Sequence, residues 1–158
     1  MTYAPRGQTP ILRVPLIWEH LSVIAALTPQ GKLYTYMQDK AFKGEHIVPF
    51  LKHLLRHMAG PLLIIWDGLP AHHGHAVKGF LRRGAAQRIH FEQLPGYAPD
   101  LNPAEGIWQY LKYVEMKNLC CHTLRELRAE LRKAIARLRH KIDVLRACID
   151  RVHLGQYL

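Results

Sequence analysis

The amino-acid sequence predicts a mixed α/β domain with a helical C-terminal end. A short continuous apolar run, Leu62 to Trp66, is typical of a strand that is buried on both faces. A helical pattern and then an alternating segment, Arg88 to Leu94, follow it, and this order indicates a crossover between parallel strands. From Asn102 onward, apolar residues recur at helical spacing. At 158 residues, the chain has the size of one domain with a substantial core.

Local signals place the remaining elements of the α/β part. The predicted order is a strand at 20–27, a strand at 33–38, a helix at 44–57, a strand at 62–66, a helix around 76–81 and a strand at 88–94. Pro29 and Gly31 mark the turn of a hairpin between the first two strands. Gly60 and Pro61 end the first helix, and Gly84 ends the second.

Two helices are predicted after Asn102. The first has one apolar face, made by Ile107, Trp108, Leu111 and Val114. The second has an apolar face made by Leu124, Leu127, Leu131, Ile135 and Leu138. Thr123 and Glu126 have the spacing of a capping box at the start of the second helix.

Composition excludes several classes of protein. With 49% hydrophobic and 22% charged residues, the chain is not a disordered tail. The apolar run Leu62 to Trp66 is far shorter than the roughly 20 residues of a membrane span, and the N-terminus does not have the pattern of a secretion signal. Three cysteines without a C-x-x-C pair form neither a disulfide framework nor a zinc knuckle. We therefore expect a cytoplasmic protein that has no membrane partner.

The charge balance favours polyanionic partners. The chain has 22 Lys and Arg against 12 Asp and Glu, a formal net charge of +10. Residues 1–60 carry seven basic and three acidic side chains, residues 61–116 carry five of each, and residues 117–158 carry ten and four. This distribution is expected if central carboxylates take part in chemistry while basic flanks contact phosphates, although basic flanks without a ligand are also common.

Asp67 and Glu105 are the acidic residues with the most informative positions. Asp67 follows the buried strand at the edge where ligand sites of open α/β sheets lie, but taken alone it is better explained as the start of a turn through Gly68. Glu105 is the third residue of a helix capped by Asn102, so it can serve the cap by reaching back to it. Alternatively, Glu105 points to the same edge as Asp67. Two carboxylates there would suit Mg²⁺, which bridges to substrate phosphates.

Two sequence blocks resemble those of a known family. The first, LIIWDGLPAHHGHAVKGFL, contains Asp67 and, five residues later, His72. The second, FEQLPGYAPDLNPAEGIWQYLK, contains Glu105 and then Trp108. In this order they resemble the catalytic core of mariner-like bacterial insertion-sequence transposases, which belong to the DDE superfamily of endonucleases. The opening TYAPRGQTP and the hairpin are similar too, so the resemblance covers about residues 3–150.

The resemblance implies a ribonuclease-H-like mixed sheet with flanking helices and a metal-dependent enzyme that cuts and joins DNA. Asp67 and Glu105 would hold Mg²⁺, or Mn²⁺ as a substitute. His72 would touch the scissile phosphate or orient Asp67, and the alternative is an ordinary histidine at the start of a helix. The eleven histidines lack the i, i+4 pair with a Glu that is typical of zinc hydrolases, so zinc is not expected.

One part of the family pattern is missing from the sequence. The first catalytic Asp of the family lies on a central strand upstream of the APRG segment, and neither Glu19 nor Asp39 stands at that place. We therefore expect a transposase fragment truncated at its N-terminus, with the first central strand absent. Without the central strand, the sheet would be divided into two halves with unpaired edges. The isolated fragment would have poor catalytic activity.

The expected organisation is a partial catalytic domain at residues 1–116 and a basic helical C-terminal extension at residues 117–158. A basic stripe opposite the leucines of the second helix would contact the DNA backbone, unless it is simply a solvated face. The stripe consists of Arg125, Arg128, Arg132 and Arg139.

Two functions remain open at this point. The chain is either a DNA-cleaving and strand-joining core, active when an upstream segment or a second polypeptide supplies the first Asp, or a non-catalytic remnant that binds DNA or oligomerises. In both cases the expected partner is DNA in the bacterial nucleoid, together with a second copy in a homodimer, and no small-molecule cofactor is expected.

Overall fold

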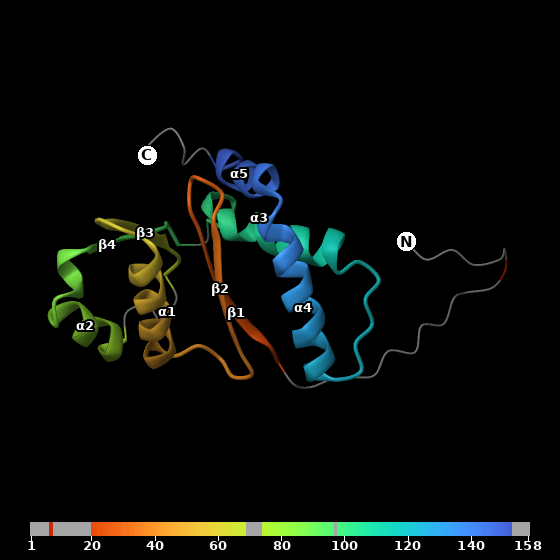
Figure 1. Ribbon diagram of the computed structural model, residues 1–158, viewed down its shortest axis with the longest axis horizontal. Coiled ribbons are helices and arrows are strands. Elements are labelled where there is room, and N and C mark those ends of the chain that lie inside the picture. Colours follow the sequence, from red (N-terminus) through yellow and green to blue (C-terminus); the bar gives the residue numbers. More distant parts are fainter. Residues whose placement is uncertain (1–6, 8–19, 69–73, 97, 153–158) are drawn as a thin grey trace.

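The computed structural model describes Gly7 and residues 20–68, 74–96 and 98–152. The strands and long helices are β1 (Ser22–Leu27), β2 (Leu33–Gln38), α1 (Gly44–His57), β3 (Leu62–Trp66), α2 (His75–Arg82), β4 (Ile89–Gln93), α3 (Pro103–Tyr110), α4 (Leu124–Arg139) and α5 (Ile142–Asp150). The β1–β2 hairpin runs through the middle of the molecule, with α1, α2, β3 and β4 on one side and α4 on the other (Figure 1). None of the helices in the described ranges has the length and apolar character that a membrane span requires.

The strands form two separate sheets of two strands each, so the mixed α/β class is confirmed. β1 and β2 pair antiparallel, and β3 and β4 pair parallel. The predicted hairpin and the predicted crossover through α2 are therefore both present. In the described residues, β1 pairs only with β2 and β3 only with β4.

The hairpin is covered on both faces because its side chains alternate. Ala25 and Leu27 pack against a C-terminal core, which consists of Leu33, Ile107, Leu111, Ala134, Ile135, Leu138, Leu145 and Cys148. Ile24 and Ala26 point the other way, to an N-terminal core, which consists of Ile47, Phe50, Leu51, Leu54, Leu62, Val77 and Ile89. The hairpin thus connects the two cores.

The turn of the hairpin is fitted closely to α5. Thr28 N–H donates to the Lys32 carbonyl at 3.0 Å, and Gly31 has a φ of 79°, a left-handed conformation that glycine adopts most readily. A Cβ on Gly31 would lie 3.0 Å from Cγ2 of Ile142. The absence of a side chain at this position therefore allows the turn to rest on the start of α5.

Arg88, just before β4, connects the end of α1 to the start of β3. Its guanidinium donates to the carbonyls of Met58 at 2.7 Å, Gly60 at 3.0 Å and Leu55 at 3.3 Å. These are carbonyls at or just beyond the C-terminal turn of α1, which the helix itself leaves without partners. The Leu62 N–H then donates to the Arg88 carbonyl at 2.6 Å, where the β3–β4 ladder begins.

The helical end of the chain packs on the hairpin rather than apart from it. Arg139 of α4 donates to the Leu33 carbonyl and to Thr35 Oγ1, both at 3.1 Å. Leu138 and Leu145 are fully buried in the C-terminal core together with Ile107. Residues 117–158 therefore share one hydrophobic core with elements that precede them.

Only one of the two hydrogen bonds of the predicted capping box at the start of α4 is formed. Thr123 Oγ1 accepts the Glu126 N–H at 3.1 Å, as expected. The Glu126 carboxylate, however, accepts the N–H of His122 at 2.8 Å, one residue before the cap. The cap of α4 is thus correctly placed, and the return bond is shifted by one residue.

The predicted burial of Val114 is wrong. A single π-helical turn, η4 (Leu111–Glu115), follows α3, and the Met116 N–H donates to the Leu111 carbonyl at 2.9 Å. This i to i+5 bond advances the side chains by one position relative to an α-helix. Val114 is consequently exposed, and the side chain of Glu115 is 5% exposed.

Glu115 is the centre of a charged network between η4 and the last two helices. Its carboxylate accepts from Lys141 Nζ at 2.8 Å and from Arg137 Nε at 2.7 Å. These hydrogen bonds, that of Lys141 first, hold the pKa of Glu115 below its usual value, and the same contact raises the pKa of Lys141.

Replacing Glu115 with Gln should lower the melting temperature at pH 7 by about 3 to 6 °C, because both hydrogen bonds lose their anionic acceptor. Since the pKa of this carboxyl is depressed on folding, its contribution is present above the unfolded value of 4.5 and is lost as the pH falls through the folded pKa. Thermal melts from pH 7 to pH 3 should show wild type and variant converging in acid. Glu130→Gln, in a more exposed pair with Lys133, is the matched control, and a constant offset at every pH would contradict this role.

Candidate active site

Asp67 lies directly after β3, at the carboxyl end of the strand. The residue before it is held on two sides, because the Trp66 carbonyl accepts the Leu94 N–H at 2.8 Å and the Trp66 ring stacks on Phe91. The ring centroids are 3.9 Å apart and the planes differ by 6°. The parallel ladder therefore extends to the last residue of β3 and fixes the backbone from which the half-buried Asp67 projects.

Glu105 lies in the first turn of α3, and it does not make the contact with the cap that was one of its two alternatives. Asn102 is the N-cap, and its Oδ1 accepts the Ala104 N–H at 3.0 Å. The N–H of Asn102 donates to the Pro99 carbonyl at 3.0 Å, across the 3-10 turn η3 (Pro99–Leu101). Because Pro99 satisfies this donor, the return bond expected from the Glu105 side chain is not made. The half-buried Glu105 carboxylate thus takes no part in capping its own helix.

Asp67 and Glu105 line one cavity. The cavity has a volume of about 970 Å³ and lies between β1 and β3, where the first turn of α3 meets them. Its lining includes every residue of β1 and β3, apolar residues of α1, and the helix start Asn102–Glu105. The fold therefore places the two carboxylates that the sequence singled out on the lining of one cavity.

The donor chemistry of these two residues fits a hard divalent cation. Mg²⁺ is commonly bound through one or two carboxylates, with water and substrate phosphates completing its coordination. Within the described ranges, no group of three or more His, Cys, Asp or Glu side chains is placed to hold a metal ion. Asp39, which does not stand at the place of the family's first catalytic Asp, forms an ion pair with Arg128. Glu19 and His72 lie outside the described residues.

The predicted arginine stripe does not form one free surface. Arg128 makes its ion pair with Asp39, just after β2, and Arg139 donates to β2 itself. Both side chains therefore fasten α4 to the hairpin, which corrects the expectation of a uniform stripe opposite the leucines. Arg125 and Arg132 are exposed on the same helix.

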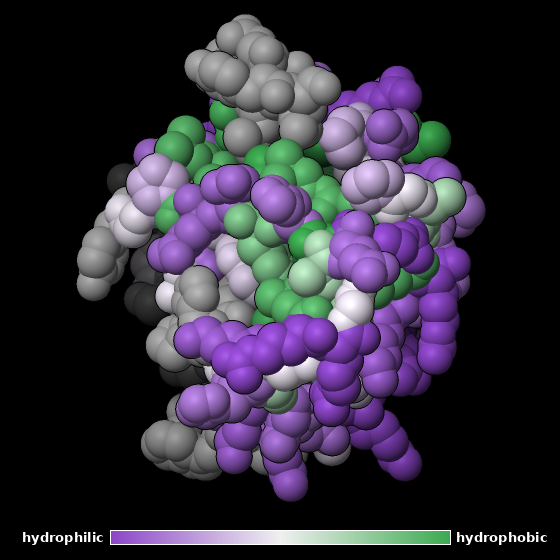
Figure 2. All heavy atoms as spheres, turned by 90° about the vertical axis from the view of Figure 1, so that its left-hand side faces the viewer, coloured by the Kyte–Doolittle hydropathy of each residue, from purple (hydrophilic) through white to green (hydrophobic). Residues whose placement is uncertain are grey.

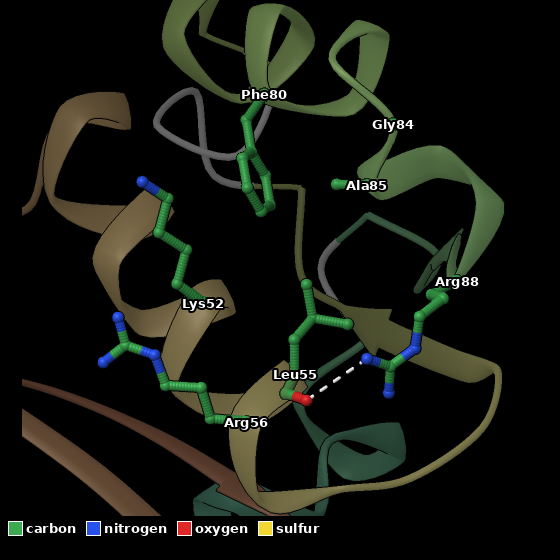
Figure 3. Close-up of a pocket in the computed structure, with 7 residues that line it drawn as sticks. All are labelled: Lys52, Leu55, Arg56, Phe80, Gly84, Ala85 and Arg88. Carbon is green, nitrogen blue, oxygen red and sulfur yellow. Dashed lines mark hydrogen bonds between the residues drawn. The ribbon is translucent and has the colours of Figure 1, made fainter.

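A second basic surface, which the sequence analysis missed, lies between α1 and α2 (Figure 3). The pocket there has a volume of about 390 Å³ and is lined by Lys52, Leu55, Arg56, Phe80, Gly84, Ala85 and Arg88. Arg88 is engaged by the α1 carbonyls, whereas Lys52 and Arg56 are exposed. In the sequence, this surface could have been recognised from the i, i+4 spacing of Lys52 and Arg56 on the polar side of α1.

Gly106, next to Glu105, sets the distance between α3 and α5. A Cβ at this position would lie 2.9 Å from Sγ and 3.3 Å from Cβ of Cys148. Burial raises the pKa of the Cys148 thiol, so it packs as a neutral side chain. The close approach of the two helices therefore depends on the absence of a side chain at Gly106.

The comparison with known families is consistent with this arrangement. A family model described as DDE superfamily endonuclease matches residues 1–128. Because the match extends over most of the sequence, the chain belongs to this family. No curated protein matches it.

Solved structures of a mariner transposase share the fold. The Mos1 mariner paired end complex with Mn superposes with a TM-score of 0.63 at 17% identity, over 94% of this chain and 49% of that chain. The Mos1 catalytic domain with Raltegravir and Mg gives a TM-score of 0.56 at 15% identity, over 84% of this chain and 80% of that one. The corresponding structure with Mn gives 0.55 at 15% identity, over 84% and 78%. The expected ribonuclease-H-like class is thus confirmed, and the chain spans about half the length of the Mos1 chain in the paired end complex.

Replacing Gly106 with Ala should destabilise the protein, although the same change in an exposed helix stabilises it by up to about 1 kcal/mol. We expect the contact with Cys148 to dominate and to lower the melting temperature by about 2 to 6 °C. The double variant Gly106→Ala/Cys148→Ala should recover most of this loss, measured against Cys148→Ala alone. A single Gly106→Ala variant that melts at or above the wild-type temperature would contradict the packing role.

Proposed function

We propose that the chain is the catalytic part of a DDE transposase, with a partial catalytic domain at residues 1–116 and a basic helical extension at 117–158, and that it takes part in metal-dependent cleavage and joining of DNA strands. One observation carries the proposal: in a chain of this family, Asp67 and Glu105 line the same cavity at the carboxyl end of a parallel strand. Ligand sites of α/β sheets lie at this edge.

In this proposal, Asp67 and Glu105 hold Mg²⁺, with Mn²⁺ as a substitute. When bound, the cation would neutralise charge on the phosphodiester and favour an oxygen nucleophile. Asp67 projects from a backbone held by the ladder and by the Trp66 stack, so its carboxylate is positioned before substrate arrives. We assign His72 to contact with the scissile phosphate or to orientation of Asp67.

The proposed substrate is DNA. The net charge of +10 favours a polyanion, and Arg125, Arg132, Lys52 and Arg56 are exposed cations on helices. A Mos1 structure similar to this chain is a paired end complex, which supports contact of this chain with element ends. A homodimeric arrangement is a further part of the proposal. Action on DNA would place the protein at the nucleoid of a bacterial cell.

A second candidate function is a non-catalytic DNA-binding remnant. The described residues contain no group of three metal-binding side chains, which favours impaired turnover of the chain alone. In this alternative, the basic helices would hold phosphates while Asp67 and Glu105 would have no catalytic role.

Mn²⁺-dependent nicking of supercoiled plasmid separates the two candidates. The enzyme proposal expects a low rate with wild type and a further loss of about 100-fold in both Asp67→Asn and Glu105→Gln, because each removes a metal ligand. Glu92→Gln, on the exposed part of β4, is the control that retains activity. Absence of nicking in every protein, with equal DNA binding, would support the remnant instead.

The DNA interface can be tested through the salt dependence of binding. In the double variant Arg125→Gln/Arg132→Gln, the slope of log K against log salt should decrease by about 2, because two phosphate contacts are lost. Fluorescence anisotropy with a short duplex between 50 and 200 mM salt measures this slope. Glu126→Gln/Glu130→Gln, on the same helix, is the matched control and should leave the slope unchanged or steeper. An unchanged slope in the arginine variant would exclude this face from the interface.

A further inference from the structure

Two histidines of α1 stand one helical turn apart on the surface of the molecule. Of the eleven histidines in the chain, only His53 and His57 are separated by four positions. Both lie in the C-terminal half of α1, and both are exposed. Residues four apart are neighbours on one face of a helix, with Cβ atoms about 5 to 6 Å apart. The pair is therefore a candidate for binding one ligand with both imidazole rings.

The two rings are close to the geometry that a shared metal ion requires. Their centroids are 4.2 Å apart, and their planes differ by 43°. Two imidazoles that bind one ion, each with a metal–nitrogen distance of about 2.0 to 2.1 Å and with an angle of about 90 to 110° at the metal, have centroids roughly 4.5 to 5 Å apart. Small rotations of the two side chains thus bring both rings onto one ion.

A backbone contact fixes the tautomer of His57. Its Nδ1 lies 2.8 Å from the carbonyl oxygen of His53. Because a carbonyl oxygen only accepts, Nδ1 carries the proton and donates it, and in the neutral ring the lone pair is then on Nε2. Histidines that bind metals commonly donate their other ring N–H to a backbone carbonyl in this way. His57 therefore has the tautomer of a metal ligand that binds through Nε2.

Tyr34 of β2 contacts both rings from a different element of the fold. The ring of Tyr34 meets that of His53 edge-on, with centroids 5.9 Å apart, and its centroid lies 6.0 Å from that of His57. Tyr34 itself is half-buried and packs against the N-terminal core. The packing of α1 on the hairpin thus helps to orient the histidine pair, so less ordering is required when an ion binds.

The charges around the pair determine which kind of ion it can hold. Burial of part of its ring, and then the neighbouring His57, hold the pKa of His53 below its usual value, so this ring is mainly neutral at pH 7. The guanidinium groups of Arg56 and Arg139 lower the same pKa further, and they also repel a cation that is held by charge alone. Within the described ranges, no third His, Cys, Asp or Glu joins the pair in a metal-binding group. The pair therefore suits ions that favour imidazole nitrogen, such as Zn²⁺ and Ni²⁺, and not Mg²⁺ or Mn²⁺.

The histidine pair lies outside the candidate active site. Neither histidine belongs to the lining of the cavity that contains Asp67 and Glu105. On the side of the molecule that carries α1 and α2, hydrophilic side chains surround hydrophobic ones (Figure 2). A zinc hydrolase would need a Glu directly after the first histidine of such a pair, and this position is Leu54. An ion bound by the pair would therefore have a structural role and not a hydrolytic one.

We propose that His53 and His57 form a metal site outside the cavity, which binds one divalent transition-metal ion that favours imidazole, such as Zn²⁺ or Ni²⁺, and fastens the last turn of α1. Water would complete the coordination of the ion. The site rests on the geometry of the pair and is independent of the proposed function. Because Phe50 and Leu54 of α1 pack in the N-terminal core, an ion that binds only the folded helix would stabilise the whole protein.

The test uses the full chain and Ni²⁺ alone. Imidazole suits Ni²⁺, whereas Zn²⁺ would also be bound by the sulfur atoms of the adjacent Cys120 and Cys121. Bound Ni²⁺ broadens nearby NMR signals, so the amide signals of His53 and His57 should broaden when the wild type is titrated. His53→Gln and His57→Gln should each raise the Ni²⁺ concentration that broadens the amide signals of this turn by at least about tenfold, because each variant leaves only one ligand.

Two further variants keep the histidine pair and serve as controls. His140→Gln removes an exposed histidine just after α4 and should bind Ni²⁺ like wild type. Tyr34→Phe keeps the ring that packs on both imidazoles and removes only the phenol oxygen, so it should also leave the Ni²⁺ affinity unchanged. Wild-type affinity in both His53→Gln and His57→Gln would overturn the proposal. A loss in Tyr34→Phe as large as theirs would overturn it too, because the phenol oxygen would then be a ligand.

The position of the broadened signals separates this site from others in the chain. Broadening confined to the surroundings of His75 or His122, with the signals of the pair unaffected, would place the ion elsewhere and overturn the proposal. Asp67→Asn should leave the broadening at His53 and His57 unchanged, because Asp67 lies in the cavity. Loss of this broadening in Asp67→Asn would overturn a site outside the cavity.

Thermal melts test whether the ion fastens the fold. Ni²⁺ at about 100 times its dissociation constant should raise the wild-type melting temperature by at least about 3 °C, because an ion that binds only the folded protein stabilises it by mass action. The double variant His53→Gln/His57→Gln should show no such rise. An equal rise in the double variant, or no rise in a wild type whose signals at the pair broaden, would overturn the stabilising role of the ion.

Discussion

The hydrogen-bonding capacity of the β1 and β3 backbones is the constraint on which the rest of this structure depends. Each strand satisfies one side in a two-stranded ladder, and each directs its other side to the cavity that also contains Asp67 and Glu105. Strand edges that have no ladder partner among the described residues, and that are bordered by apolar side chains, are costly when exposed to water. The candidate site therefore lies where β1 and β3 face the same cavity.

Side-chain packing keeps the two sheets in place without a shared ladder. In the N-terminal core, Phe50 and Leu54 of α1 pack against Ile24 of β1 and against Leu62 of β3, so one helix contacts both sheets. On the other side of the hairpin, α3 contributes Ile107 to the C-terminal core and Glu105 to the cavity. The positions of Asp67 and Glu105 are consequently determined by packing on both faces of β1. The close approach of α3 to α5 at Gly106 therefore also affects the position of the neighbouring Glu105 carboxylate.

Sequence patterns predicted the local elements well because short-range physics determines them. The bounds of α1 and β3 follow from apolar periodicity and from the Gly60-Pro61 stop, and Asn102 caps α3 as its side-chain chemistry requires. The features that sequence reasoning missed depend on partners far along the chain. Arg139 donates hydrogen bonds to Thr35 and Leu33, which lie 104 and 106 positions earlier in the chain. The π turn that buries Glu115 is accompanied by ion pairs of Glu115 with α4 and with the residue before α5. The cavity itself is defined by three segments, so no single pattern indicates it.

Paramagnetic broadening by Mn²⁺ tests the central claim most directly, because it locates a bound cation without requiring turnover or DNA. The account predicts that in a titration of the full chain the amide signals of Gly68 and Ala104, which neighbour Asp67 and Glu105, broaden first and at the same Mn²⁺ concentration. Broadening of only one of the two signals, or broadening centred on the histidines of α1 with both signals unaffected, would show that the two carboxylates do not form one metal site.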